Sequence, residues 1–195
     1  MRACIGALAA AVLALGALQQ SDAQAIARTR VVIATELGEI VVELADDAAP
    51  TTVANFLRYV DAGQYAGGAF HRAVRLDNQN RSDVPIEVIQ GGRARAFRGQ
   101  GPLERTTDTG LVHQDGTISM ARGTATDSGH SDFFICINDQ PALDHGGARH
   151  PDGQGFAAFG RVIEGRDVVR AIQARPTERE RLSAPVTILQ MRRTE

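Results

Sequence analysis

Apolar residues recur at every second position along several short stretches of this chain, and such alternation predicts β-strands. Residues 30–44 show it most clearly, because Leu37-Gly38 divides them into two alternating halves, which is typical of a β-hairpin. Gly, Asp, Asn and Thr residues separate the later stretches. Many short strands joined by glycine-rich turns favour a barrel or a sandwich. Further strands are predicted at residues 69–74, 87–90, 117–121, 132–137, 156–162 and 186–191.

Two other segments have apolar residues at helical spacing. In the first, Pro50 stands in the first turn and Gly63 follows the last turn, so both ends of a helix are marked. The second segment predicts a shorter helix near residue 170. Residues 76–85 and 143–154 are polar and are predicted to be long surface loops. The apolar positions are Val53, Phe56, Leu57 and Val60 in the first helix and Val168, Val169 and Ile172 in the second.

The N-terminal 25 residues have the pattern of a cleavable secretory signal. Arg2 precedes an uncharged apolar run over residues 5–18, and Ala23-Gln24-Ala25 forms an A-x-A cleavage site. The run is shorter than the roughly 18 apolar residues that span a membrane. We therefore expect residues 1–25 to be removed, and residues 26–195 to form one domain without stable membrane association. The expected location is outside the cell, or the periplasm where the organism has two membranes.

Composition and charge narrow the possible functions. The net charge of −2 gives no basic field for nucleic acid, and the chain has no Trp. The five histidines lack the spacing of a helical metal site, and no serine stands in a strand–turn–helix elbow. Within residues 26–195, Cys136 is the only cysteine, so no internal disulfide is expected and a buried core position is predicted for it. These patterns disfavour a nucleic-acid-binding protein, a zinc enzyme and a serine hydrolase.

The first candidate for a catalytic residue is a cation inside an apolar strand. Arg72 lies between Phe70 and Val74, and taken alone it would be a solvated edge residue. It is not alone, because the predicted strand at 87–90 ends in Gln90 beside two glycines.

Six motifs in order make the chain resemble the cyclophilins. They are FHRAV, VIQGG, GTISMAR, SDFFICI, LDHGG and FAAFGRVIEGRDVV, and together they cover nearly all of residues 26–195. The resemblance implies a mainly β fold, a closed eight-stranded antiparallel β-barrel capped by two α-helices. It also implies peptidyl-prolyl cis-trans isomerase activity on unfolded or folding polypeptides that contain proline, with no cofactor. Nothing in the sequence calls for more than a monomer.

The same resemblance implies the site residues. Arg72 matches the catalytic arginine, and Gln90 matches the glutamine that binds substrate backbone and steadies that arginine. Ala121 and Arg122 match the strand edge that pairs with the substrate. Met120 is expected just behind the pocket. The remaining substrate-binding positions are Phe134, Val88 and Leu143, which hold the proline ring, together with Asp132 and Phe156.

Two acidic residues depart from the family pattern and leave alternatives open. Glu87 replaces a phenylalanine at the pocket wall, so either its carboxylate points outward or another apolar residue, with Ile86 as the candidate, fills the place. Asp132 replaces a glutamine and could pair with Arg72. Both favour the alternative function, a module that binds proline-containing segments as a chaperone or scaffold with weak or no catalysis. The insertion at 76–85 is either a solvated loop or a rim that selects substrates.

Overall fold

The structure is a computed structural model that describes residues 28–93, 101 and 103–194. The predicted signal at residues 1–25 lies outside the described residues. Within the part of the chain that is described, no helix is long and apolar enough to cross a membrane, and no cluster of potential metal ligands occurs.

The described strands form one antiparallel sheet that closes on itself. Eight strands follow the order β1-β2-β7-β5-β6-β4-β3-β9, and β9 pairs again with β1. The closed eight-stranded barrel that the resemblance implied is therefore confirmed. A ninth strand, β8, pairs only with β9. The strands are β1 (Arg30–Thr35), β2 (Gly38–Leu44), β3 (Ala69–Val74), β4 (Val88–Gly92), β5 (Thr117–Met120), β6 (Phe133–Cys136), β7 (Ala157–Glu164), β8 (Thr177–Glu178) and β9 (Arg181–Arg193).

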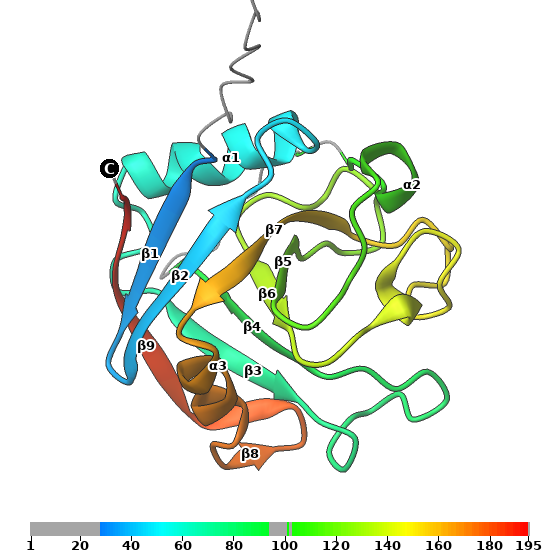
Figure 1. Cartoon of the computed structure of the whole chain (residues 1–195). Coiled ribbons are helices and arrows are strands. Elements are labelled where there is room, and N and C mark those ends of the chain that lie inside the picture. Colours follow the sequence, from blue (N-terminus) through cyan, green and yellow to red (C-terminus); the bar gives the residue numbers. More distant parts are fainter. Residues whose placement is uncertain (1–27, 94–100, 102, 195) are drawn as a thin grey trace, which may run out of the picture.

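Two helices cap the barrel at opposite ends, as expected (Figure 1). Helix α1 (Pro50–Asp61) begins at the proline, buries one face against the sheet and ends before Gly63, whose φ of 63° suits glycine. Helix α3 (Arg166–Gln173) contacts β2, β3 and β4 at the other end. The structure adds two short helices that the apolar pattern did not predict, α2 (Thr106–Thr109) and the 3-10 turn η1 (Pro141–Leu143).

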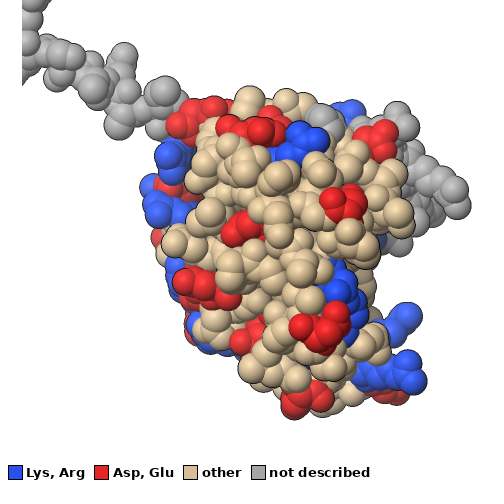
Figure 2. All heavy atoms as spheres, turned by 90° about the vertical axis from the view of Figure 1, so that its right-hand side faces the viewer, with Lys and Arg blue, Asp and Glu red and all other residues tan. Residues whose placement is uncertain are grey.

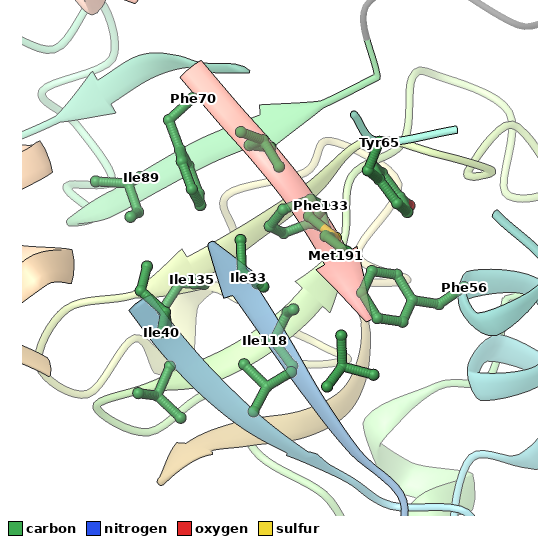
Figure 3. Close-up of a cluster of buried hydrophobic side chains, with 14 of the residues drawn as sticks. Ile33, Ile40, Phe56, Tyr65, Phe70, Ile89, Ile118, Phe133, Ile135 and Met191 are labelled. Atoms are coloured by element: carbon green, nitrogen blue, oxygen red, sulfur yellow. The ribbon is translucent and has the colours of Figure 1, made fainter. Parts of the chain in front are cut away.

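The barrel interior is filled by apolar side chains from all sides of the sheet (Figure 3). Phe133 lies at its centre and makes three edge-to-face contacts with aromatic rings. Its ring centroid is 5.9 Å from Phe56, 5.8 Å from Tyr65 and 5.7 Å from Phe70. Such contacts add to the stabilisation that burial alone provides. Because the interior is packed, a ligand site must lie on the outside of the barrel.

A second, smaller apolar cluster lies outside the barrel, over β4 and β6. Alternation along β6 explains it, because Phe133 points inward and its neighbour Phe134 points outward. On the face that Figure 2 shows, acidic and basic side chains are interspersed and neither sign forms a continuous patch. The buried members of the outer cluster are Val74, Ile86, Val88, Phe134, Cys136 and Leu143.

Candidate active site

A β-bulge in β3 turns Arg72 to the outside of the barrel. In a regular strand Arg72 would face the same side as Phe70, which is fully buried in the interior. The pairing of β3 with β4 shifts register between these two residues, so that His71 is the extra residue. A bulge of this kind re-aims the side chains that follow it. The bulge therefore explains how β3 can carry a cation on its outer side while other residues of the strand fill the barrel core.

Strand register then brings three predicted site residues into one row. Arg72 lies opposite Gln90 in the β3–β4 pair, and Gln90 lies opposite Phe134 in the β4–β6 pair. Residues that are opposite in neighbouring strands have side chains within contact distance. The row runs across the outer face of the sheet, so the apolar outer cluster continues directly into the polar pair.

Among the described residues, the Arg72 guanidinium has two hydrogen-bond partners. Its Nη1 donates to Gln90 Oε1 at 2.7 Å, as the resemblance implied. Its Nε and Nη2 both donate to Glu180 Oε2, at 2.9 and 2.6 Å. The acidic partner that the sequence offered, Asp132, is not the residue that pairs with Arg72. Its carboxylate instead packs over Gly92, where a Cβ would lie 2.0 Å from Asp132 Oδ1.

The row opens into a pocket of about 240 Å³. Phe134 is its apolar centre, and the ring meets Phe156 edge-on at 5.4 Å. Behind Phe134 the buried His113 ring is stacked at 5.8 Å and is held by Asp144, 2.7 Å from its Nδ1. The pocket thus combines six apolar side chains with one amide and three guanidinium groups. Its lining residues are Arg72, Ile86, Val88, Gln90, Ala121, Arg122, Phe134, Leu143, Arg149 and Phe156.

The side chain of Arg122 fastens the loop at residues 143–154 to the pocket wall. Its Nη2 and Nη1 donate to the Asp152 carboxylate at 2.8 and 3.0 Å, and its guanidinium lies 5.3 Å above the Phe156 ring. Hydrogen bonds from Arg122 hold the pKa of Asp152 well below its ordinary value. From the sequence, only the backbone of Arg122 was expected to contact the substrate. The structure shows in addition that its side chain holds Asp152 and covers the Phe156 ring.

Two predicted site residues lie beside the pocket, outside its lining. Met120 is buried in the barrel core and does not line the pocket. Asp132 lines an adjoining shallow hollow that shares Gln90, Ala121 and Arg122 with the pocket. All the other predicted site residues line the pocket itself.

Asp132 is expected to cost stability at neutral pH. Burial raises the pKa of this half-buried carboxyl, and the charges of His71, His130 and Arg93 offset it only partly. A carboxyl with a raised folded-state pKa stabilises the fold below its unfolded pKa and loses that contribution as the pH rises. Asp132→Asn should therefore increase the free energy of unfolding more at pH 7 than at pH 3, as measured by urea denaturation. An equal change at both pH values would contradict this assignment.

Both alternatives that the sequence left open for Glu87 hold. Its carboxylate points outward, and Ile86 fills the place at the pocket wall. Glu87 Oε2 accepts a hydrogen bond from Asn138 Nδ2 at 2.9 Å, and Oε1 accepts one from Gln173 Nε2 at 3.5 Å. Ile86 is buried and lines the pocket. The carboxylate therefore imposes no desolvation cost on the pocket.

This arrangement predicts opposite behaviour for two adjacent residues. Ile86→Ala should raise the Kd for a proline-containing peptide by roughly fivefold, since apolar contact area is lost. Glu87→Ala should leave that Kd within about twofold. Titration calorimetry of both variants with one peptide measures the difference. A larger effect at Glu87 would place its carboxylate at the bound substrate.

Two residues at the site escaped sequence reasoning. Arg149 lines the pocket, and its Nη1 donates to the carbonyl oxygens of Val84 and Arg81 at 2.7 and 3.0 Å. It thereby joins the two loops that were predicted at 76–85 and 143–154. Glu180 comes from the turn between β8 and β9. Neither belongs to a motif, and only the fold brings them to Arg72.

Comparisons with known proteins indicate the family to which the chain is similar. The family model described as cyclophilin type peptidyl-prolyl cis-trans isomerase/CLD matches residues 30–193. Peptidyl-prolyl cis-trans isomerase cyp18 of Streptomyces antibioticus is 41% identical over 143 residues, which are 71% of this chain and 80% of that protein. Peptidyl-prolyl cis-trans isomerase A of Dickeya dadantii is 37% identical over 171 residues, 86% of this chain and 82% of that protein. A cyclophilin-type isomerase structure from Cryptosporidium parvum shares the fold with a TM-score of 0.66 at 19% identity, covering 86% of this chain and 98% of that one.

Proposed function

We propose that this chain, which belongs to the cyclophilin-type peptidyl-prolyl cis-trans isomerase family, accelerates rotation about Xaa–Pro bonds with Arg72 as its catalytic residue. The substrates are polypeptides that contain proline. The observation that supports this role best is the position of the Arg72 guanidinium at the edge of an apolar pocket, with Gln90 and Glu180 fixing it.

The reaction needs no nucleophile. Amide resonance gives the peptide bond a rotation barrier of about 18–20 kcal/mol. Xaa–Pro bonds populate both isomers and exchange over tens to hundreds of seconds. A catalyst has only to bind the twisted amide more tightly than either planar form.

Arg72 has the chemistry for this differential binding. Twisting the amide makes the prolyl nitrogen pyramidal and localises a lone pair on it. A guanidinium N–H directed at that nitrogen gains a hydrogen bond only in the twisted state. Guanidinium suits the role because it remains charged and presents donors in a fixed fork. The Arg72 side chain is 31% exposed, so part of it is open to the pocket.

The pocket supplies binding and orientation. Phe134, Val88 and Leu143 contribute apolar side chains to the pocket, and we assign the proline ring to them. Ala121 and Arg122 flank it where the chain leaves β5, and we assign their backbone groups to the substrate chain. Gln90 holds Arg72 and offers its amide to the substrate backbone. Holding the bond in one place relative to the guanidinium reduces the entropy lost on reaching the transition state.

Exchange spectroscopy on a short Xaa–Pro peptide tests this function without a coupled protease. Addition of the protein should merge or exchange-broaden the cis and trans NMR signals, because the exchange rate rises far above the uncatalysed rate. If the peptide binds but its exchange rate does not change, the chain is the alternative module, a chaperone or scaffold that binds proline segments.

The proposal includes a location and an assembly state. The apolar run at residues 5–18 and the A-x-A site at 23–25 support export, to the periplasm in an organism with two membranes. The mature domain acts as a monomer without stable membrane association and without nucleic acid. N-terminal sequencing of the exported protein should show a mature end at residue 26, and light scattering should give the monomer mass.

A further inference from the structure

Glu180 occupies an unusual backbone position next to Arg72. It is the second residue of the tight turn that joins β8 to β9, and the preceding residue, Arg179, has a φ of 55°. Residues other than glycine seldom adopt this left-handed conformation, and it costs free energy. The turn is held by β3, where Ala73 N–H donates to the Glu180 carbonyl oxygen at 2.9 Å. A turn with a strained residue thus holds Glu180 where its carboxylate meets Arg72 on the outside of the barrel.

The carboxylate is buried and uses both oxygens. Glu180 is 8% exposed. Its Oε2 accepts the two hydrogen bonds from Arg72, at 2.9 and 2.6 Å. Its Oε1 accepts the Asn80 backbone N–H at 2.8 Å and lies 3.9 Å from Arg149 Nη2. One carboxylate therefore joins the arginine in β3 to the two long loops that border the pocket.

The charge state of this carboxyl follows from the same contacts. Burial raises the pKa of Glu180, but the hydrogen bond from Asn80 and the hydrogen bond and charge of Arg72 outweigh it, and the net pKa lies below its ordinary value. Arg149 acts in the same direction. The residue is therefore an anion at neutral pH, and its hydrogen bonds to Arg72 are charge-assisted.

We infer that Glu180 is a positioning residue, which fixes the plane of the Arg72 guanidinium and anchors the loop at residues 76–85 to it. Gln90 holds one terminal nitrogen, and Glu180 holds the edge formed by Nε and Nη2. With both partners in place, the long arginine side chain loses its torsional freedom before substrate binds. The N–H groups on the pocket side then meet the twisted amide without further ordering. This inference rests on the proposed role of Arg72.

The test compares two substitutions of Glu180 with a matched control. Glu180→Ala removes the carboxylate, and Glu180→Gln keeps the volume and one acceptor oxygen. Asp61→Ala breaks a more exposed carboxylate–arginine pair that is also joined through Nε and Nη2, Asp61 with Arg193, between α1 and β9 and away from the pocket. The kcat and KM for a proline peptide come from NMR exchange measurements. Circular dichroism confirms that each variant is folded.

We expect Glu180→Ala to lower kcat by about tenfold to a hundredfold while KM changes by less than about threefold, because substrate still occupies the pocket. Glu180→Gln should recover part of the loss, and Asp61→Ala should change neither constant by more than about twofold. A folded Glu180→Ala protein with wild-type kcat would overturn the inference. A rise in KM alone would assign Glu180 to substrate binding and would overturn it too.

A measurement on the unaltered protein covers the case in which the variants do not fold. The Arg72 Nε–H should give an NMR signal that exchanges with water much more slowly than that of the exposed Arg161. Equal exchange rates would show that Glu180 does not hold the guanidinium in solution. If instead Arg72→Ala keeps full activity, the proposed role of Arg72 fails. The inference then fails because Arg72 is not catalytic, whether or not Glu180 holds it.

Discussion

Replacing Arg72 with alanine is expected to lower kcat/KM for Xaa–Pro isomerisation by about a hundredfold or more, the range seen when one donor to a developing charge is removed. The loss should fall almost entirely on kcat, because the hydrogen bond to the prolyl nitrogen forms only in the twisted state. Exchange spectroscopy on one peptide, at several peptide concentrations, separates kcat from KM. A fall in affinity with unchanged kcat would contradict a catalytic role.

Two further variants sharpen this expectation. Arg72→Lys keeps the charge but lacks the planar fork that bonds Gln90 and Glu180 together, so it should recover little of the activity. Arg161→Ala removes an exposed arginine outside the pocket lining and should leave activity unchanged. If the lysine variant were nearly as active as the wild type, a positive charge alone would suffice, and the fixed guanidinium would have no special role.

Replacing Phe134 with alanine is expected to raise the Kd for a proline peptide by roughly tenfold or more, since the ring is the apolar centre of the pocket. Its ring also supports Phe156 at 5.4 Å and packs on His113 at 5.8 Å, so the rim should loosen as well. Titration calorimetry measures the affinity, and urea denaturation measures the accompanying loss of stability.

Phe133 is the natural comparison, because it is the next residue of the same strand and faces the other way. Phe133→Ala should lower the free energy of unfolding by about 3–5 kcal/mol, since it removes a fully buried ring from three aromatic contacts. It removes no pocket residue, so the fraction that remains folded should bind peptide with little change. Equal losses of affinity in the two variants would contradict the separation of the inner and outer clusters.

The sequence pattern predicted most of the fold because strands with one buried face alternate, as β2 does, and strands buried on both faces form short apolar runs, as β6 does. Alternation located the hairpin over β1 and β2, a short apolar run located the strand over β6, and Pro50 and Gly63 marked the ends of α1. The pattern did not reveal β8, which is two residues long, or α2, which is four. The last strand also begins earlier than predicted, at Arg181, because its first residues pair with β8 and β3 around the exposed segment before Val186.

The residues of the candidate site fall into two groups, those that the sequence could locate and those that only the fold brings together. Residues inside motifs, such as Arg72, Gln90 and Phe134, could be located because their order along the chain carries the information. Glu180 could not be located in this way, because its contact with Arg72 spans 108 positions along the chain. The contact also depends on a turn in which Arg179 is left-handed, and no glycine at that position marks the turn in the sequence. Asp132 was the partner that the sequence offered for Arg72, and its place over Gly92 could not be foreseen, because no motif encodes this contact between distant parts of the chain.

Closure of the barrel by β1 and β9 also has a consequence for how the protein is made. Val31 pairs with Arg193, so the first strand has no second neighbour until the chain has been made as far as β9. Folds dominated by such distant pairings form slowly, since the chain must close a long loop before the contact stabilises it. A chain that emerges from its N-terminus, at the ribosome or across a membrane, therefore cannot complete the barrel early. The topology itself delays completion of the barrel until β9 has been synthesised.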